Sequence, residues 1–408
     1  MREWSRWMRG ILPVLAGLWG HGPVGADVLR VGPGERLHTV AEAAALARDG
    51  DTVEVGEGVY GGDVAVWTQR RLTIRGVGAR PRLVAGGASA EGKGIWVMRG
   101  DEMVVENIAF EGARGPYSNG SGIRHEAGAL TVRNCLFRDN EMGILTANKA
   151  SMSLVVENSE FSHAVPVSPH ISHLLYAGRI GSLLVRGSYF HHGRVGHLLK
   201  SRARTNRVEY SRLSDEAEGQ ASYELDFPDG GQVFLIGNLV RQAAGTENRR
   251  MIAFGAEGLQ HEDNRLVLVG NTLVDDVPEG GEFVAVWSQE RVRITAVNNL
   301  LVGGCVGSLC RDAVFRRGTP GPGEEQIIVE GQGNVQIVGL ASRARLEADG
   351  FRPSLSMQWT AGTAFEERPG EADGGVQWPV PAREYVHPAG SRVLERAGPR
   401  VPGAFQPE

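Results

Sequence analysis

The chain is poor in cysteine and has no long hydrophobic segment. Its 408 residues include only Cys135, Cys305 and Cys310, too few for a disulfide scaffold, and they form no Cys/His spacing of a structural zinc site. Cys305 and Cys310 are close enough in sequence to pair in an oxidising compartment, which leaves both the disulfide and the thiols open. No segment approaches about 18 uninterrupted apolar residues, so we expect no membrane-spanning helix.

The chain has no excess of positive charge, and lysine is scarce. The net charge of −5 gives no basic excess to neutralise phosphates, so we expect no nucleic-acid partner. Of 43 Lys and Arg residues, only Lys93, Lys149 and Lys200 are lysine. Lysine can lose its proton near neutral pH where arginine cannot, and the neighbouring charges of Arg202 and Arg204 would depress the pKa of Lys200. Lys200 is therefore a candidate base, although three lysines must lie somewhere in any case.

What the chain does contain is a short apolar motif that returns every 23 to 33 residues. Its clearest copies are Leu130–Phe137 (LTVRNCLF) and Leu154–Phe161 (LVVENSEF). Weaker copies surround Asn107, Gly187, Tyr210, Asn238, Asn271 and Asn299. A repeat of this length corresponds to one coil of a solenoid, which buries its apolar face by stacking on its neighbours.

Alternation within each copy predicts β-strands, because Leu, Val and Phe recur with a period of two. Asn follows at the bend, where it tolerates left-handed backbone geometry and can hydrogen-bond to the Asn of the next coil. The 57 glycines suit a chain with several turns per coil. Leucine-rich repeats and propeller blades would need spacings that are not found here.

The N-terminus has the features of a secretory signal peptide. Arg2, Arg6 and Arg9 precede the apolar stretch 11–19, and the small residues Val24-Gly25-Ala26 end before Asp27. We expect residues 1–26 to be removed and the mature protein to be secreted or periplasmic. The alternative is a buried N-terminal strand.

The next segment predicts a helix that caps the solenoid. Thr39 and Glu42 fit a capping box, and Val40, Ala43, Ala44 and Ala47 form an apolar stripe. Terminal repeats of solenoids must be covered, and a short helix before the first strand would cover the first coil.

From Ala44 to Tyr60, ending in Gly50-Asp51-Thr52-Val53 and Gly58-Val59-Tyr60, the sequence resembles the opening of secreted β-helix proteins of the pectin-lyase-like superfamily. The resemblance covers about residues 27–310 and implies an all-β, right-handed parallel β-helix with a short N-terminal capping helix. Residues 311–408 would supply the last coil or coils and a C-terminal cap or strap. This fold hosts lyases, hydrolases, esterases, epimerases and binding proteins, so the reaction must be argued from the site.

One strand of each coil can be aligned so that apolar residues point inward and polar residues outward. This alignment predicts an outward column of His125, Thr146, Tyr176, Lys200 and Asp226, with Arg202 and Glu224 one outward step away. Seven of the 11 histidines, including His173 and His197, lie in the same stretch. Coils about 4.8 Å apart would place a base, a phenol and a carboxylate within reach of one sugar unit.

Such a column suits cleavage of an acidic, uronate-containing polysaccharide by β-elimination. The reaction needs a positive group at the substrate carboxylate, a base for the adjacent proton and an acid for the leaving oxygen. Lys200 would be the base, Tyr176 or a nearby histidine such as His197 the acid, and Arg202 or bound Ca²⁺ would neutralise the substrate carboxylate. The use of a lysine base resembles β-helical lyases such as chondroitinase B and related alginate lyases. His125, His173, Arg179, Arg204, Glu224 and Asp226 would bind substrate. Those lyases pair Lys with an Arg on the neighbouring coil, and Arg179, one coil earlier, is the nearest substitute here.

Two other functions remain open at this stage. Glu224 and Asp226 could form the acid/base pair of an inverting glycoside hydrolase, or supply oxygen ligands to Ca²⁺. A glycan-binding or surface protein without activity would use the same outer face. In each case we expect a monomer whose partner is an acidic polysaccharide or oligosaccharide.

Overall fold

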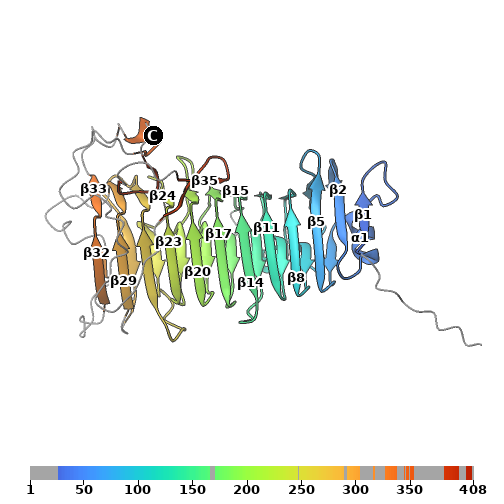
Figure 1. The fold of residues 1–408 in the computed structure, drawn as a ribbon, viewed down its shortest axis with the longest axis horizontal. Helices are drawn as coiled ribbons and strands as arrows, with labels where there is room; N and C mark the ends of the chain where they lie inside the picture. The colour runs from blue at the N-terminus through green and yellow to red at the C-terminus, as the bar shows by residue number, and fades with distance from the viewer. Residues whose placement is uncertain are drawn as a thin grey trace, which may run out of the picture.

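The computed structural model describes residues 26–165, 171–246, 248–288, 292–303, 316–317, 327–337, 344, 346–348, 350–352, 381–394 and 401–406. Residues 1–25 of the expected signal peptide, and both Cys305 and Cys310, lie outside this set. The described chain is nearly all β-structure and forms a parallel β-helix of about ten coils, which confirms the predicted fold class. Figure 1 shows the coils side by side along an elongated solenoid.

Each coil contributes one strand to each of three parallel sheets, which we call sheets A, B and C. Sheet A consists of β1 (Val28–Val31), β2 (Thr52–Gly56), β5 (Arg71–Val77), β8 (Glu102–Glu106), β11 (Ala129–Arg133), β14 (Ser153–Glu157), β17 (Ser182–Arg186), β20 (Thr205–Glu209), β23 (Gln232–Ile236), β26 (Arg265–Val269), β29 (Val292–Val297) and β32 (Ile327–Gln332).

Sheets B and C follow in the same coil order. Sheet B consists of β3 (Val59–Gly61), β6 (Arg82–Val84), β9 (Ala109–Glu111), β12 (Leu136–Arg138), β15 (Glu160–Ser162), β18 (Tyr189–His191), β21 (Arg212–Ser214), β24 (Leu239–Gln242), β27 (Thr272–Asp275), β30 (Leu300–Gly303) and β33 (Val335–Ile337). Sheet C consists of β4 (Ala65–Trp67), β7 (Gly94–Met98), β10 (Ser121–His125), β13 (Met142–Thr146), β16 (His173–Ala177), β19 (Leu199–Ser201), β22 (Leu225–Phe227), β25 (Arg250–Phe254), β28 (Glu282–Val286) and β31 (Arg316–Arg317).

The recurring motif is the corner between sheets A and B. Asn107, Asn134 and Asn158 have φ of 55°, 52° and 48°, the left-handed geometry expected of Asn at this bend. In later coils the residue just before the Asn takes the left-handed geometry, for example Gly270 at φ 60°. The following Asn then extends its side chain along the stack.

These later asparagines form a hydrogen-bonded ladder, as the sequence predicts. The Nδ2 groups of Asn238, Asn271 and Asn299 each donate to the Oδ1 of the next Asn, at 3.0, 2.9 and 2.8 Å, ending at Asn334. The same side-chain oxygens accept backbone N–H groups, so the ladder satisfies polar groups that the corner buries.

Apolar side chains fill the solenoid interior. Phe110, Phe137, Phe161 and Phe190 stack in successive coils of sheet B, with ring centroids 5.1, 4.5 and 4.6 Å apart. This spacing follows the separation of parallel strands, since equivalent residues are one strand apart.

The N-terminal end is covered by α1 (Val40–Leu46). The predicted capping box is confirmed: Glu42 N donates to Thr39 Oγ1 at 3.1 Å, and Thr39 N donates to the Glu42 carboxylate at 3.0 Å. Val40 and Ala43 are fully buried against the first coil. Figure 1 shows α1 at this end of the stack.

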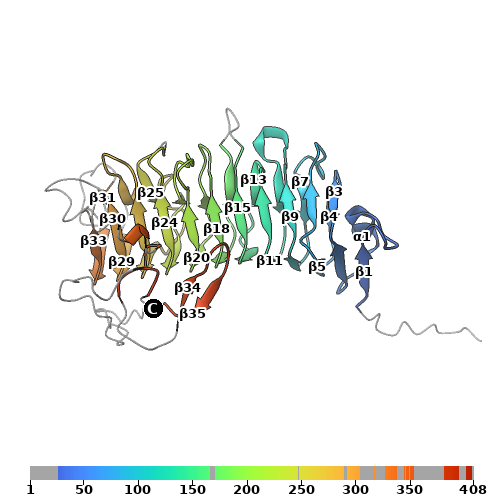
Figure 2. The same ribbon diagram turned by 90° about the horizontal axis from the view of Figure 1, so that it is seen from above.

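The described C-terminal segments, 381–394 and 401–406, lie along the solenoid. They include the antiparallel hairpin β34 (Arg383–Tyr385) and β35 (Ser391–Val393), which Figure 2 shows beside the coils. Tyr385 and Phe405 pack with Leu239, Val274 and Leu300 in a second apolar cluster on the outer side of sheet B. Sheet B is therefore partly covered here, whereas the candidate site below lies on sheet C.

Candidate functional site

A column of side chains on sheet C forms the centre of the candidate site. The strand register aligns Arg124, Leu145, Tyr176, Lys200 and Asp226 in five successive coils. Their neighbours on the other side of the strand are the buried apolar residues Ile123, Ile144, Leu175, Leu199 and Leu225. Alternation thus brings Tyr176, Lys200 and Asp226 together, as predicted from the sequence.

The register expected for the first coils was wrong by one residue. Arg124, not His125, pairs with Leu145 and so stands in the column. His125 is 1% exposed, and its Nε2 lies 2.8 Å from the Ala127 carbonyl oxygen. Burial lowers the pKa of His125 to about 4. A slip of one residue moves a side chain to the other face of a strand, which is why His125 does not reach the outer surface.

Lys200 is held between two carboxylates. Its Nζ lies 2.9 Å from Asp226 Oδ2 and 3.1 Å from Glu257 Oε1. The Lys200 side chain is 10% exposed and that of Asp226 is 2% exposed, whereas Glu257 is 51% exposed. The inner pair is therefore buried, and the outer carboxylate lies at the surface.

These contacts contradict the expected depression of the lysine pKa. Burial disfavours the charged form of Lys200, but the Asp226 and Glu257 carboxylates outweigh it and raise the pKa above its ordinary value. Arg202 and Arg204 are neighbours in sequence, yet the groups that touch Lys200 Nζ are acids. Lys200 is thus an ammonium group in this arrangement.

Arg202 links the column to the adjacent loops. Its Nε donates to the Tyr176 hydroxyl at 2.8 Å, and its Nη2 lies 2.6 Å from Glu257 Oε2. Its Nη1 pairs with Asp229, a carboxylate 1% exposed that also binds Arg179 Nε at 2.7 Å. Glu257 therefore bridges two cations, Lys200 and Arg202.

Two histidines lie behind Asp226. The rings of His173 and His197 stack at 4.7 Å, and His197 Nε2 is 3.3 Å from Asp226 Oδ2. His197 N donates to His173 Nδ1 at 3.0 Å. Burial lowers the pKa of His173 to about 3 and that of His197 well below its ordinary value, so both rings are neutral near pH 7.

Glu224 does not reach the outer face. It is 0% exposed, and its charged neighbours are Asp215 and Asp275 rather than the groups around Lys200. Burial, followed by the charge of Asp215, raises the pKa of Glu224 well above its usual range. Glu224 and Asp226 therefore do not meet on the outer face, and their expected pairing as acid and base or as Ca²⁺ ligands is wrong. The carboxylate near Asp226 on the outer face is Glu257.

A hollow of about 420 Å³ continues the site toward the N-terminal coils. Lys93, Tyr117, Arg124, Asn148 and Tyr176 line it. Tyr117 is 79% exposed, and Tyr176 also accepts the hydrogen bond from Arg202. The hollow and the charged column thus form one continuous surface, with aromatic and basic groups at one end and the ion-paired cluster at the other.

The sequence did not predict that Glu257 and Asp229 belong to this surface. Glu257 follows β25, 57 residues beyond Lys200, in a turn where Gly255 and Gly258 have φ of 75° and 91°. Asp229 lies two residues after β22, and its pairing with Arg179 and Arg202 depends on the register between coils. Among the expected residues, Arg204 is exposed beside the cluster without entering the contacts above.

The protein is thus a parallel β-helix with a charged groove on sheet C. No family model matches the chain, and no curated protein shows significant similarity to it. The described residues contain no helix long and apolar enough to cross a membrane.

Proposed function

We propose that the protein is a secreted, carbohydrate-active β-helix protein, related to the pectin-lyase-like superfamily, that cleaves an acidic glycan by β-elimination. The observation that supports this is the carboxylate of Glu257, held jointly by Lys200 Nζ and Arg202 Nη2 at the surface. Two converging cations at the edge of a groove form a binding site for a carboxylate. A uronate group would take the place of Glu257, which is half-exposed on a turn.

In this reaction the proton on the carbon next to the uronate carboxylate is removed. The electron pair forms the new carbon–carbon double bond, and the glycosidic oxygen leaves and takes up a proton. Lys200 and Arg202 neutralise the charge that develops on the carboxylate. Tyr176, whose oxygen accepts a hydrogen bond from Arg202 Nε on the open face, removes this proton as the phenolate and then, as the phenol, donates it to the leaving glycosidic oxygen. Lys200 keeps its proton because its pKa is raised, so its role changes from base to charge neutraliser.

A glycoside hydrolase is the second candidate, with Asp226 and Glu257 in place of the pair expected from the sequence. Burial, opposed by Lys200, leaves the pKa of Asp226 raised, whereas Arg202 and Lys200 outweigh burial at Glu257 and lower its pKa. Two carboxyls with opposite shifts are the pattern of an acid and a base. The lyase is preferred because Asp226 is 2% exposed and has little access to a glycan.

A panel of uronate polysaccharides such as alginate, polygalacturonate, hyaluronan and chondroitin would separate these functions. A lyase produces unsaturated uronate, which absorbs in the ultraviolet, together with new reducing ends. New reducing ends without that absorbance would indicate the hydrolase. Binding without either product would identify a non-catalytic glycan-binding protein.

Variants test the roles of the residues on the best substrate. Tyr176→Phe should abolish turnover while substrate binding persists. Glu257→Gln should tighten binding of a uronate oligosaccharide about two- to fivefold, which corresponds to the loss of a competing surface ion pair of up to about 1 kcal/mol. Glu262→Gln, the control, removes an exposed acid from the same loop and should change nothing. Equal effects of the two Glu variants would contradict the proposed carboxylate site.

Export rests on residues 1–26 of the sequence alone. We propose that the mature chain begins at Asp27 and that the protein acts outside the cytoplasm as a monomer. N-terminal sequencing of protein recovered from the periplasm or medium tests the first statement, and retention of Met1 would contradict it. Light scattering of the purified protein tests the second.

A further inference from the structure

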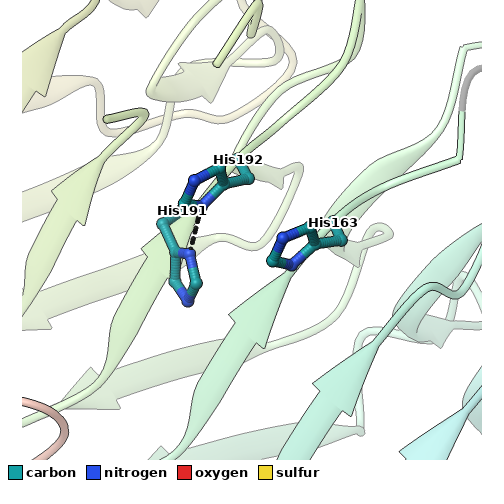
Figure 3. Close-up of side chains that lie close together, drawn as sticks. All are labelled: His163, His191 and His192. Carbon is teal, nitrogen blue, oxygen red and sulfur yellow. Dashed lines mark hydrogen bonds between the residues drawn. The ribbon is translucent and has the colours of Figure 1, made fainter. Parts of the chain in front are cut away.

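Three histidines meet on sheet B, away from the groove on sheet C. β15 and β18 pair in register, with Ser162 opposite His191. The next residue of each coil is a histidine, and the rings of His163 and His192 stack at 4.7 Å with an angle of 6° between their planes. Figure 3 shows His163, His191 and His192 gathered at this point.

Nitrogen atoms of the three rings converge. One nitrogen from each of His163, His191 and His192 lies within 4.8 Å of the others. His191 Nδ1 and His192 Nδ1 are 2.5 Å apart and share a hydrogen bond, whose proton a bound cation would displace. His163 Nδ1 is buried and has no hydrogen-bond partner within the described part of the chain. Each of the three rings therefore has a nitrogen available to a shared ligand.

A carboxylate fixes the orientation of one ring. His191 Nε2 lies 3.2 Å from Glu160 Oε1, which leaves Nδ1 to face His192. A carboxylate that binds the outer nitrogen of a metal-bound histidine is a recurrent second layer of metal sites, because it fixes the tautomer and raises the basicity of the ring. His191 is 7% exposed, whereas His163 and His192 are only partly buried, so the cluster opens to solvent on one side.

The fold does not require histidine at these two positions. His163 and His192 have φ of 57° and 53°, and the equivalent bend also has positive φ at Gly112 and Asp139. Gly, Asn and Asp suit this left-handed geometry better than other residues. The bend therefore belongs to the solenoid, and the imidazole groups add something that the backbone does not need.

We propose that His163, His191 and His192 bind one divalent transition metal ion of the zinc type, with Glu160 as the positioning carboxylate. Three imidazoles leave a fourth position to water, and imidazole favours Zn²⁺, Cu²⁺ or Ni²⁺ over Ca²⁺ and Mg²⁺. The ion would join two successive coils just before the chain continues into β16 and β19, which carry Tyr176 and Lys200. The proposal does not depend on the lyase activity.

The test uses the full mature protein without a histidine tag, freed of metal by a chelator. Calorimetric titration with Zn²⁺ should show one saturable site per chain, and Ca²⁺ should not compete. Co²⁺ should give the intense visible absorption of a four-coordinate ion, which Zn²⁺ then removes. Absence of saturable binding at one equivalent would overturn the proposal.

Variants separate this site from adventitious binding. His163→Asn and His192→Asn remove an imidazole but tolerate the left-handed backbone, and each should weaken Zn²⁺ binding at least tenfold. Glu160→Gln should weaken it about tenfold. His38→Ala removes an exposed histidine elsewhere and should bind as the parent does. If circular dichroism shows that both Asn variants are folded and they bind Zn²⁺ as tightly as the parent, the three histidines are not the site.

Discussion

Replacing Lys200 with methionine removes the ammonium group that neutralises Asp226. The Asp226 side chain is 2% exposed, and its Oδ2 would keep only the contact with the neutral His197 at 3.3 Å. Methionine fills a similar volume, so the change isolates the charge. Breaking a buried ion pair by removing one partner costs about 3–5 kcal/mol, because the other charge remains buried without compensation. The free energy of unfolding of Lys200→Met should fall by about that amount.

The loss of stability in Lys200→Met should depend on pH. Without Lys200, the effect of burial on Asp226 is no longer opposed by that positive charge, so the pKa of Asp226 lies further above its ordinary value. A group whose pKa is raised by folding contributes stability below its unfolded pKa, about 3.9, and this stability is lost as the pH rises through the folded pKa. The free energy of unfolding of Lys200→Met should therefore be close to that of the parent near pH 4 and fall furthest below it at neutral pH.

Urea denaturation followed by circular dichroism, at pH 4 and pH 7, measures both effects. The double variant Lys200→Met/Asp226→Leu should recover most of the loss, because neither charge is then buried alone. Lys93→Met is the matched control: Lys93 also contacts two carboxylates, but its side chain is 37% exposed, so we expect a change of only about 0–1 kcal/mol. Equal losses for Lys200→Met and Lys93→Met, or no recovery in the double variant, would refute the reasoning.

Three further perturbations test other parts of the fold. Glu224→Gln should stabilise the protein at pH 8 and change its stability little at pH 4. The buried Glu224 has a raised pKa, so its ionisation makes folding less favourable as the pH rises above its unfolded pKa of about 4.3. Parallel curves of stability against pH for the variant and the parent would contradict this. Asn271→Ala should cost about 2–5 kcal/mol by orphaning buried ladder groups, with the exposed Asn119→Ala as a neutral control in the same urea titration. Phe161→Ala should cost about 3–5 kcal/mol by opening a cavity in the ring stack, and a smaller shift in thermal unfolding than that of Asn119→Ala would exclude the packing argument.

The sequence predicted the solenoid well because the corner between sheets A and B has nearly constant length. Most copies of the motif place an Asn or Gly directly after a five-residue strand, so local alternation defines the register. Sheet C follows connections of varying length: ten residues separate the last residue of β15 from the first of β16, but three separate β12 from β13. That variation explains the slip at His125.

The candidate site was harder to predict because its contacts join different coils. Tyr176, Lys200 and Asp226 were found by alternation within their strands. Glu257 was missed because it lies in the turn after β25, where no strand pattern constrains it. The three-histidine cluster was counted only as a local enrichment, since His163 and His192 meet only when two coils are in register.

The C-terminal segments change how the solenoid can unfold. In a stack whose coils touch only their neighbours, stability is nearly one-dimensional and an end can fray one coil at a time. Here Ala382 N donates to the Tyr210 hydroxyl, while Ala404 N and Gly403 N donate to Thr272 Oγ1 and the Asn298 carbonyl. The described C-terminal segments thus touch the coil of Tyr210 and also the coils of Thr272 and Asn298, which the coil of β23 and β24 separates from it. Opening the C-terminal end requires releasing these contacts as well, so several coils should unfold as one cooperative unit, and amide exchange should report a shared opening free energy from Tyr210 to Asn298.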